Sequence, residues 1–258
     1  MKRALLFALG TLLGALAAVT LVHAFAGKPP PAYITAAIID PARPEADTQR
    51  DVLRRPAACL AFAGVMPGER VADLIPGGGY FTRLFSVVVG PGGKVYAVVA
   101  ASQPGQAPDT TTLAAPVQAI AADAHYGNVS VLVQNLGALA LPDNLDLVWT
   151  SRNYHDFHNM PGVNVVDLDK AVLKALKPGG VFLVLDHAAA KGSGFADTNT
   201  MHRVDPEAVK AEVVSAGFIY MDTSNVLRNP ADPHTAPVWD PSIRDRTDQF
   251  ILKFQKPK

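Results

Sequence analysis

Acidic and histidine side chains cluster in two short stretches of the sequence, "NYHDFH" and "LDH". The residues concerned are Tyr154, His155, Asp156, His158, Asp186 and His187. Histidine is suited to proton transfer because its ordinary pKa lies near neutral pH, and a neighbouring carboxylate can fix its tautomer. The two stretches therefore indicate a site for general acid–base catalysis. The alternative for each histidine is a structural hydrogen bond at the start of a loop.

Metal binding is a second chemistry open to the same side chains. His155-x-x-His158, with Asp186 and His187, would supply the nitrogen and oxygen ligands that zinc, iron or manganese accept. The spacing is not that of H-E-x-x-H, however, and the segment has the pattern of a loop and not of a helix. We therefore predict no metal site from this set.

A glycine-rich stretch, "DLIPGGGYFT" at residues 73–82, is the other chemical signal. Gly77, Gly78 and Gly79 follow a short apolar segment and precede a segment with helical spacing. A glycine loop between a strand and a helix lets the backbone approach a ligand, and the N–H groups of the helix favour an anionic or polar portion of it. The stretch is not a dinucleotide loop, because Thr82 stands where G-x-G-x-x-G requires its third glycine.

Alternating strands and helices must position both signals. We expect strands at residues 70–75, 94–100, 129–135, 145–151, 181–187, 218–228 and 247–255. We expect helices at residues 48–63, 80–89, 111–125, 166–177 and 206–216. This alternation predicts an α/β fold: a doubly wound, mostly parallel, Rossmann-like sheet of seven strands. No helical pattern separates the last two strands, so the last strand is expected to be antiparallel.

In that fold the loops after the fourth and fifth strands open onto the same crevice as the glycine loop. His155 and His187, which follow these strands, are therefore expected to converge there. His202 lies between the fifth strand and the next helix, and we keep it as a further candidate.

Several motifs together resemble the class I S-adenosylmethionine-dependent methyltransferases. Asp73 in a strand before the glycine loop resembles their motif I, and "AVLKALKPGGVFLVLDH" resembles the unit that ends in their fifth strand. More narrowly, "GGGYFT", "NYHD", "KPGG", "DH", "HR" and "TDQF" resemble the exported, predicted methyltransferases of bacteria. The resemblance runs from about Asp51 to Pro257.

The resemblance implies S-adenosylmethionine as cofactor and a small-molecule methyl acceptor. The implied cofactor-binding residues are Asp73, Gly77, Gly78, Gly79, Tyr80 and the position of Val99. For methyl transfer to a hydroxyl or amine, we expect His155 or His187 as the base and Asp186 or Asp156 as its orienting partner. Tyr154 and His158 complete the implied catalytic set.

Two positions depart from the family pattern. Ile75 stands where the first loop glycine is usual, and Val99 stands where an acid usually accepts hydrogen bonds from the ribose hydroxyls. Loss of a charged hydrogen-bond acceptor costs about 1.5–3 kcal/mol. The alternative function is therefore an exported ligand-binding protein on the same fold that has lost the cofactor.

The amino terminus has the pattern of an export signal. A positive start, "MKR", precedes a long uncharged apolar run and the small-residue pattern Ala24-x-Ala26. We expect residues 1–26 to be a cleaved signal peptide or an anchor, which places the rest outside the cytoplasm, in the periplasm. Contact with a membrane is expected only if the segment is not cleaved. We interpret residues 27–50 as a Pro-rich arm or linker and residues 51–258 as the folded domain.

The charge pattern gives no support to nucleic-acid binding. The chain has 23 basic and 23 acidic residues, and loss of Lys2 and Arg3 would leave a net charge of −2. No basic stripe is present. Cys59 is the only cysteine, so no internal disulfide forms, and no exposed apolar stripe indicates an oligomeric state.

Overall fold

The computed structural model describes residues 29–101 and 110–258. The expected signal peptide or anchor at residues 1–26 lies outside this range. Within the described residues, no helix combines the length and the apolar character that a membrane crossing needs.

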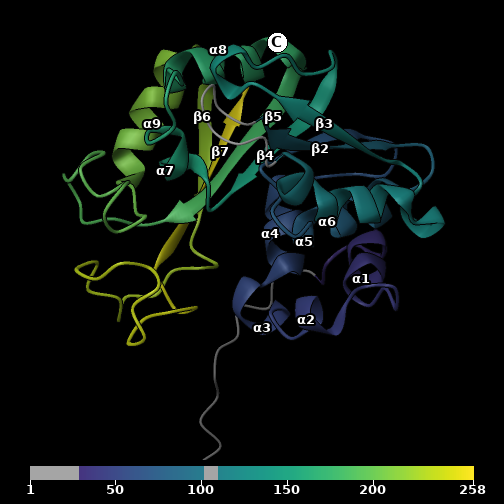
Figure 1. Ribbon diagram of the computed structural model, residues 1–258, viewed down its shortest axis with the longest axis horizontal. Coiled ribbons are helices and arrows are strands. Elements are labelled where there is room, and N and C mark those ends of the chain that lie inside the picture. Colours follow the sequence, from purple (N-terminus) through teal and green to yellow (C-terminus); the bar gives the residue numbers. More distant parts are fainter. Residues whose placement is uncertain (1–28, 102–109) are drawn as a thin grey trace, which may run out of the picture.

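A single seven-stranded sheet forms the centre of the molecule (Figure 1). Its order is β3-β2-β1-β4-β5-β7-β6, and β7 runs antiparallel to both of its neighbours. The strands are β1 (Arg70–Leu74), β2 (Lys94–Ala100), β3 (Val129–Gln134), β4 (Leu145–Ser151), β5 (Leu176–His187), β6 (Ile219–Ser224) and β7 (Gln249–Gln255). The predicted fold class is confirmed, including the antiparallel last strand.

Helices cover both faces of the sheet, as a mostly parallel sheet requires. One face carries α1 (Ala32–Ile38), α4 (Pro56–Ala63), α5 (Tyr80–Val89) and α6 (Thr110–Ala122). The other face carries α7 (Tyr154–Phe157), α8 (Val165–Ala175) and α9 (Pro206–Ser215). Shorter elements are α2 (Glu45–Thr48), α3 (Asp51–Arg54) and the 3₁₀ turns η1 (Ala124–Tyr126) and η2 (Leu136–Ala138).

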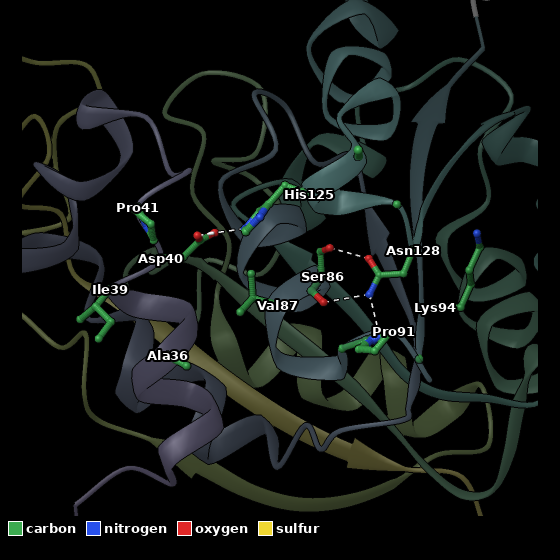
Figure 2. A pocket seen from close by; sticks show the side chains of 14 residues that line it. Ala36, Ile39, Asp40, Pro41, Ser86, Val87, Pro91, Lys94, His125 and Asn128 are labelled. Carbon is green, nitrogen blue, oxygen red and sulfur yellow. Dashed lines mark hydrogen bonds and ion pairs between the residues drawn. The ribbon is translucent and has the colours of Figure 1, made fainter.

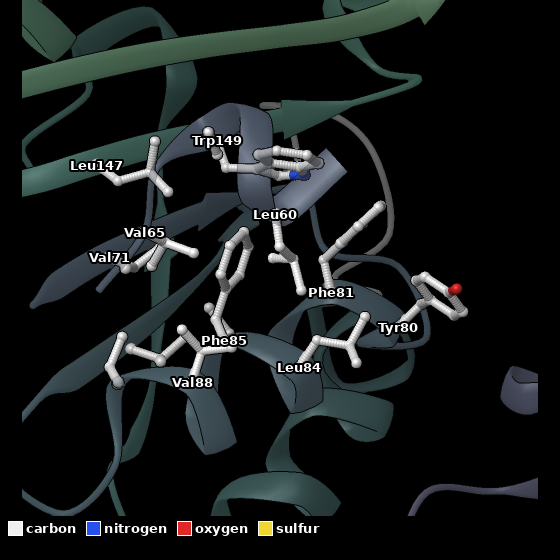
Figure 3. Packing of buried hydrophobic residues seen from close by; sticks show 14 of the residues in the cluster. Leu60, Val65, Val71, Tyr80, Phe81, Leu84, Phe85, Val88, Leu147 and Trp149 are labelled. Carbon is white, nitrogen blue, oxygen red and sulfur yellow. The ribbon is translucent and has the colours of Figure 1, made fainter. Parts of the chain in front are cut away.

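An aromatic cluster fixes α5 against the sheet (Figure 3). Trp149 of β4 is fully buried, with ring centroids 4.6 Å from Phe81 and 5.4 Å from Phe85. Phe81 and Phe85 are four residues apart, so both lie on one side of the helix. Because α5 begins directly after the glycine loop, this packing also fixes where the loop lies.

The arm before the domain is more ordered than the sequence indicated. Its Pro-rich composition suggested a linker, but the described part of it forms α1 and α2. Ile34 and Ala37 of α1 are buried in the same core cluster as α5. Arg43 ties the arm to the domain: it donates to both oxygens of Asp51, at 2.8 and 2.6 Å, and to the Ile38 carbonyl. The arm is therefore part of the fold.

The helix expected at residues 48–63 is interrupted. It consists of α3 and α4, separated at Arg55, whose φ is +43°. Pro56 accounts for the break, because a proline disfavours helical geometry in the residue before it and cannot donate a backbone hydrogen bond. The break turns α3 toward the carboxyl ends of the strands.

We expect Ile34→Ala to lower the free energy of unfolding by about 2–5 kcal/mol, because it leaves a cavity in the core. Urea unfolding followed by Trp fluorescence measures the change. Ile39→Ala, at the end of the same helix and 72% exposed, is the matched control and should cost less than about 0.5 kcal/mol. Equal, small losses for both variants would show that the arm does not contribute to the core.

Candidate functional site

The glycine loop joins β1 to α5 at the carboxyl edge of the sheet. Asp73, at the end of β1, is 2% exposed and accepts a hydrogen bond of 2.7 Å from the Thr82 hydroxyl in the first turn of α5. Burial raises the pKa of Asp73 to about 7, and the bond from Thr82 opposes part of that rise. This hydrogen bond thus joins β1 to α5, the two elements on either side of the glycine loop.

The loop backbone is left-handed at three positions. Gly77 and Gly79 have φ values of +56° and +78°, which glycine adopts without strain. Ile75 has a φ of +51°, and for a β-branched residue this conformation is an outlier that costs about 1–3 kcal/mol. Two hydrogen bonds hold Ile75 in place: its N–H donates to Val98, and its carbonyl accepts from the Asn153 side chain, both at 2.9 Å.

The three glycines have different roles in space. A Cβ on Gly79 would lie 2.2 Å from Ile120, so this glycine lets α6 approach the loop. A Cβ on Gly77 or Gly78 would meet nothing within 4 Å. These two residues therefore present bare backbone to open space, as a cradle for a ligand requires.

That open space is a pocket of about 210 Å³ at the carboxyl ends of β1 and β4. The glycine loop, Asp73, Tyr80 and Asn153 line it, together with three arginines. The arginines are Arg50 beside α3, Arg54 within α3 and Arg152 after β4. Burial and then the charges of Arg152 and Arg50 lower the pKa of Arg54 to about 10. The pocket has an excess of positive charge and suits an anionic group.

Two of the implied cofactor-binding residues, Tyr80 and Val99, are buried and in contact with other parts of the protein. Tyr80 is 3% exposed, and its hydroxyl donates to Asp51 at 2.5 Å, so it joins α3 to the start of α5. Val99 is 5% exposed and packs in the core cluster of α5 and α6. Val99 itself offers no side-chain hydrogen-bond acceptor at this position of β2.

His155 and Asp186 form a buried pair between the ends of β4 and β5. The His155 Nδ1 lies 2.8 Å from one Asp186 oxygen. The Asp186 carboxylate also accepts the backbone N–H groups of His155 and His187, at 2.8 and 2.7 Å. Burial opposes the charged imidazolium, but Asp186 and Asp156 outweigh it and raise the pKa of His155 to about 10. His155 is therefore charged at neutral pH and is a poor base.

His187 has the opposite environment. Burial, followed by the positive charges of Arg152 and His155, lowers the pKa of His187 well below its ordinary value. Its Nδ1 lies 2.7 Å from the Thr247 hydroxyl, and its Nε2 has no hydrogen-bond partner among the described residues. The ring lines a hollow of about 200 Å³ with Arg152 and Trp239. His187 is thus neutral at pH 7, and Thr247 holds its ring in place.

Tyr154 and His158 lie apart from this cluster. The Tyr154 hydroxyl is 2.8 Å from the carboxylates of both Asp169 and Glu212, and the His158 Nε2 is 3.0 Å from Glu212. The reason is α7: residues four apart in a helical turn share a side, so this pair faces α8 and α9 while His155 faces β5.

Several functional positions are not evident from the sequence. Arg50, at the end of the arm, and Arg54, in α3, both line the pocket, and no pattern in the sequence indicates this position for either. Arg152 is the exception, since its position directly after β4 is a signal that it lies at the crevice. His202 is kept from the sequence, but its contact with His155, 47 residues away, has no sequence signal.

A larger hollow, of about 800 Å³, lies elsewhere in the described part of the chain (Figure 2). It lies at the amino ends of β2 and β3, opposite the crevice. Its polar groups satisfy one another: His125 pairs with Asp40 at 3.0 Å, and Ser86 bonds to Asn128. Because ligands of doubly wound sheets bind at the carboxyl ends of the strands, the smaller pocket is the candidate site.

Comparison with known proteins gives partial sequence matches. No family model matches the chain. It is 34% identical over 128 residues to the ubiquinone/menaquinone biosynthesis C-methyltransferase UbiE of Pasteurella multocida, covering 48% of this chain and 42% of that protein. For UbiE of Shewanella woodyi the identity is 32% over 136 residues, covering 51% and 48%. The chain thus spans less than half the length of these curated relatives, both of which are named methyltransferases.

Solved structures match over most of the chain. A SAM-dependent methyltransferase from Aquifex aeolicus has a TM-score of 0.58 and 18% identity, covering 81% of this chain and 93% of that one. The glycopeptide N-methyltransferase MtfA, complexed with S-adenosylmethionine, has a TM-score of 0.53 and 16% identity, covering 81% and 87%. The [4+2]-cyclase SpnF matches with a TM-score of 0.56 and 16% identity, covering 82% of each chain. At these identities the likeness concerns the fold alone: the chain has the fold of class I SAM-dependent methyltransferases.

Proposed function

We propose that the chain transfers a methyl group from S-adenosylmethionine to a small-molecule acceptor. The observation that carries the proposal is the glycine loop between β1 and α5, whose bare backbone at Gly77 and Gly78 opens onto an arginine-lined pocket. The named methyltransferases among the sequence relatives support the same activity.

The pocket residues fit the methionine end of the cofactor. That end carries a carboxylate, and Arg54 and Arg152 line the pocket with no ion pair among the described residues. Burial lowers the pKa of both guanidinium groups. The charges of Arg152 and Arg50 lower the pKa of Arg54 further, whereas Asp245 and Asp186 oppose the fall at Arg152, and a bound anion would stabilise both buried charges. We expect these two arginines to hold the carboxylate and the glycine backbone to lie along the aliphatic part.

The ribose end fits less well, because Val99 offers no hydrogen-bond acceptor. Loss of one charged acceptor costs about 1.5–3 kcal/mol, which is about ten- to a hundredfold in affinity. The proposal therefore includes weaker cofactor binding than in relatives that keep the acid, and not its loss.

The bound cofactor supplies an electrophilic methyl group on a sulfonium sulfur. The protein's part is to hold the acceptor and to take up its proton. His187 fits that task because it is neutral and held by Thr247. Its hollow and the cofactor pocket share Arg152 as a lining residue, so the two spaces are adjacent. Asp186 holds His155 beside them and accepts the His187 backbone N–H.

We further propose that the protein is exported, as in the exported, predicted methyltransferases that its motifs resemble. Support comes from the sequence of residues 1–26, with its positive start and uncharged apolar run.

Gly78→Val should weaken S-adenosylmethionine binding by at least about tenfold, because the new side chain would project into the cradle. Gly78 lines the pocket and is not left-handed, so the substitution does not strain the backbone. Gly92→Val, in an open turn away from the pocket, is the matched control and should bind as the wild type does. Isothermal titration calorimetry measures both. Equal affinity of the two variants would refute the cradle.

His187→Gln should lower kcat about 100-fold or more, because a positioned base contributes about 10²–10⁴-fold. Its cofactor affinity should be unchanged. The assay measures transfer of a labelled methyl group from S-adenosylmethionine to a panel of small molecules. Their acceptor atoms are hydroxyl oxygens, amine nitrogens or nucleophilic carbons. The pKa of His187 lies below its ordinary value, so this side chain stays unprotonated between pH 8 and about 6.5. Protonation of His187 should therefore not lower the kcat of the wild type in that range. Full turnover by His187→Gln, beside the exposed control His125→Gln, would exclude this base.

A fusion of residues 1–40 to alkaline phosphatase, which is active only outside the cytoplasm, tests export. We expect an active fusion, and Leu13→Arg within the apolar run should abolish that activity by adding a charge. An inactive wild-type fusion that accumulates in the cell would contradict export.

A further inference from the structure

We propose that His155, Asp156 and His202 form a binding site for a divalent transition metal ion, with Zn²⁺ favoured. The set differs from the one considered in the sequence, in which His155 was combined with His158, Asp186 and His187 and from which we predicted no metal site. The proposal does not depend on methyl transfer.

The three ligand atoms have the spacing of a coordination sphere. The His155 Nε2 lies 3.2 Å from the His202 Nδ1 and 3.3 Å from an Asp156 oxygen, and the latter two atoms are 3.6 Å apart. Around one tetrahedral Zn²⁺ with bonds of about 2.0–2.1 Å, neighbouring ligand atoms are about 3.3–3.4 Å apart. An octahedral ion with the same bonds would need about 3.0 Å. One tetrahedral ion therefore fits all three atoms with little movement.

The hydrogen bonds of Asp186 fix the tautomer of His155 that can bind a metal ion through Nε2. Asp186 already accepts two backbone N–H groups, so it also acts as acceptor toward the His155 Nδ1, which must carry the proton. The lone pair of a neutral His155 is then on Nε2 and points to the other two ligand atoms. A carboxylate behind a histidine is the usual second partner of a histidine that binds a metal.

The converging atoms require a positive charge between them. The Nε2 lone pair of His155 and the Asp156 oxygen are both acceptors, and such a contact is unfavourable unless a cation lies between them. A metal ion placed between the three atoms would supply that charge and bind all of them at once.

The surroundings hold the ligands and leave one side open. His155 is 2% exposed, whereas the side chains of Asp156 and His202 are 34% and 39% exposed, so an ion can enter from solvent. The His202 ring packs edge-on against Trp239, with centroids 5.0 Å apart. Three protein ligands with an open fourth position are the arrangement of catalytic zinc sites, whereas structural sites use four.

The nature of the ligands selects the class of ion. Two imidazole nitrogens and one carboxylate oxygen suit Zn²⁺, Co²⁺ and Fe²⁺. Mg²⁺ and Ca²⁺ prefer oxygen ligands and higher coordination numbers. The tetrahedral spacing favours Zn²⁺ within the first group.

Zinc titration of the untagged protein at pH 7, in competition with a chromophoric chelator, tests the site. The wild type should bind about one equivalent, and His202→Ala and Asp156→Asn should each weaken binding by at least about tenfold. Both residues are partly exposed, so the variants should fold, as circular dichroism checks. His158→Gln, in the same segment but outside the site, should bind as the wild type does.

Cobalt provides an independent readout of geometry. Co²⁺ in the wild type should give the intense visible absorption of a tetrahedral ion, and His202→Ala should lose it. Uptake of less than about a tenth of an equivalent of Zn²⁺ by the wild type would overturn the proposal. So would unchanged binding by folded His202→Ala, or a loss in His158→Gln as large as in His202→Ala.

Discussion

The left-handed backbone between β1 and α5 is the constraint on which the rest of the site depends. Three residues with positive φ reverse the chain so that bare glycine backbone faces the crevice. Ile75 makes this turn costly, and two hydrogen bonds offset the cost: the buried bond from Thr82 to Asp73, and the partly buried bond from Asn153 to the Ile75 carbonyl. The aromatic packing of α5 on β4 supplies the remaining support. A loop with a strained residue persists only where its surroundings determine it this strongly.

Two chemical environments of opposite character lie next to this loop. The arm and the end of β4 bring arginines together, so the pocket attracts an anion. The ends of β4 and β5 bring histidines and aspartates together, so the adjacent region attracts a proton or a metal ion. Arg152 lines both the loop pocket and the hollow beside His187, where burial and then the charge of Arg152 lower the pKa of His187.

The sequence predicts the sheet well because the information is local. Each strand or helix is indicated by a pattern of about 15 residues or fewer, such as alternating apolar residues, a glycine after a helix or the KPGG segment. The order of the strands then follows from the fold class that these elements indicate together. The sequence predicts the site less well because its contacts are distant. His202 meets His155 across 47 residues, and Arg54 reaches the loop only through the break at Arg55. A single helical turn, interpreted as a loop, explains why His158 faces away from His155.

The central claim is that the glycine loop binds the methionine end of S-adenosylmethionine. A crystal structure with S-adenosylhomocysteine tests it most directly. The account predicts electron density along Gly77 and Gly78, with the ligand carboxylate within hydrogen-bond distance of Arg54 or Arg152. Density for the ligand in the hollow between Asp40 and Asn128, or an empty pocket at saturating ligand, would contradict it.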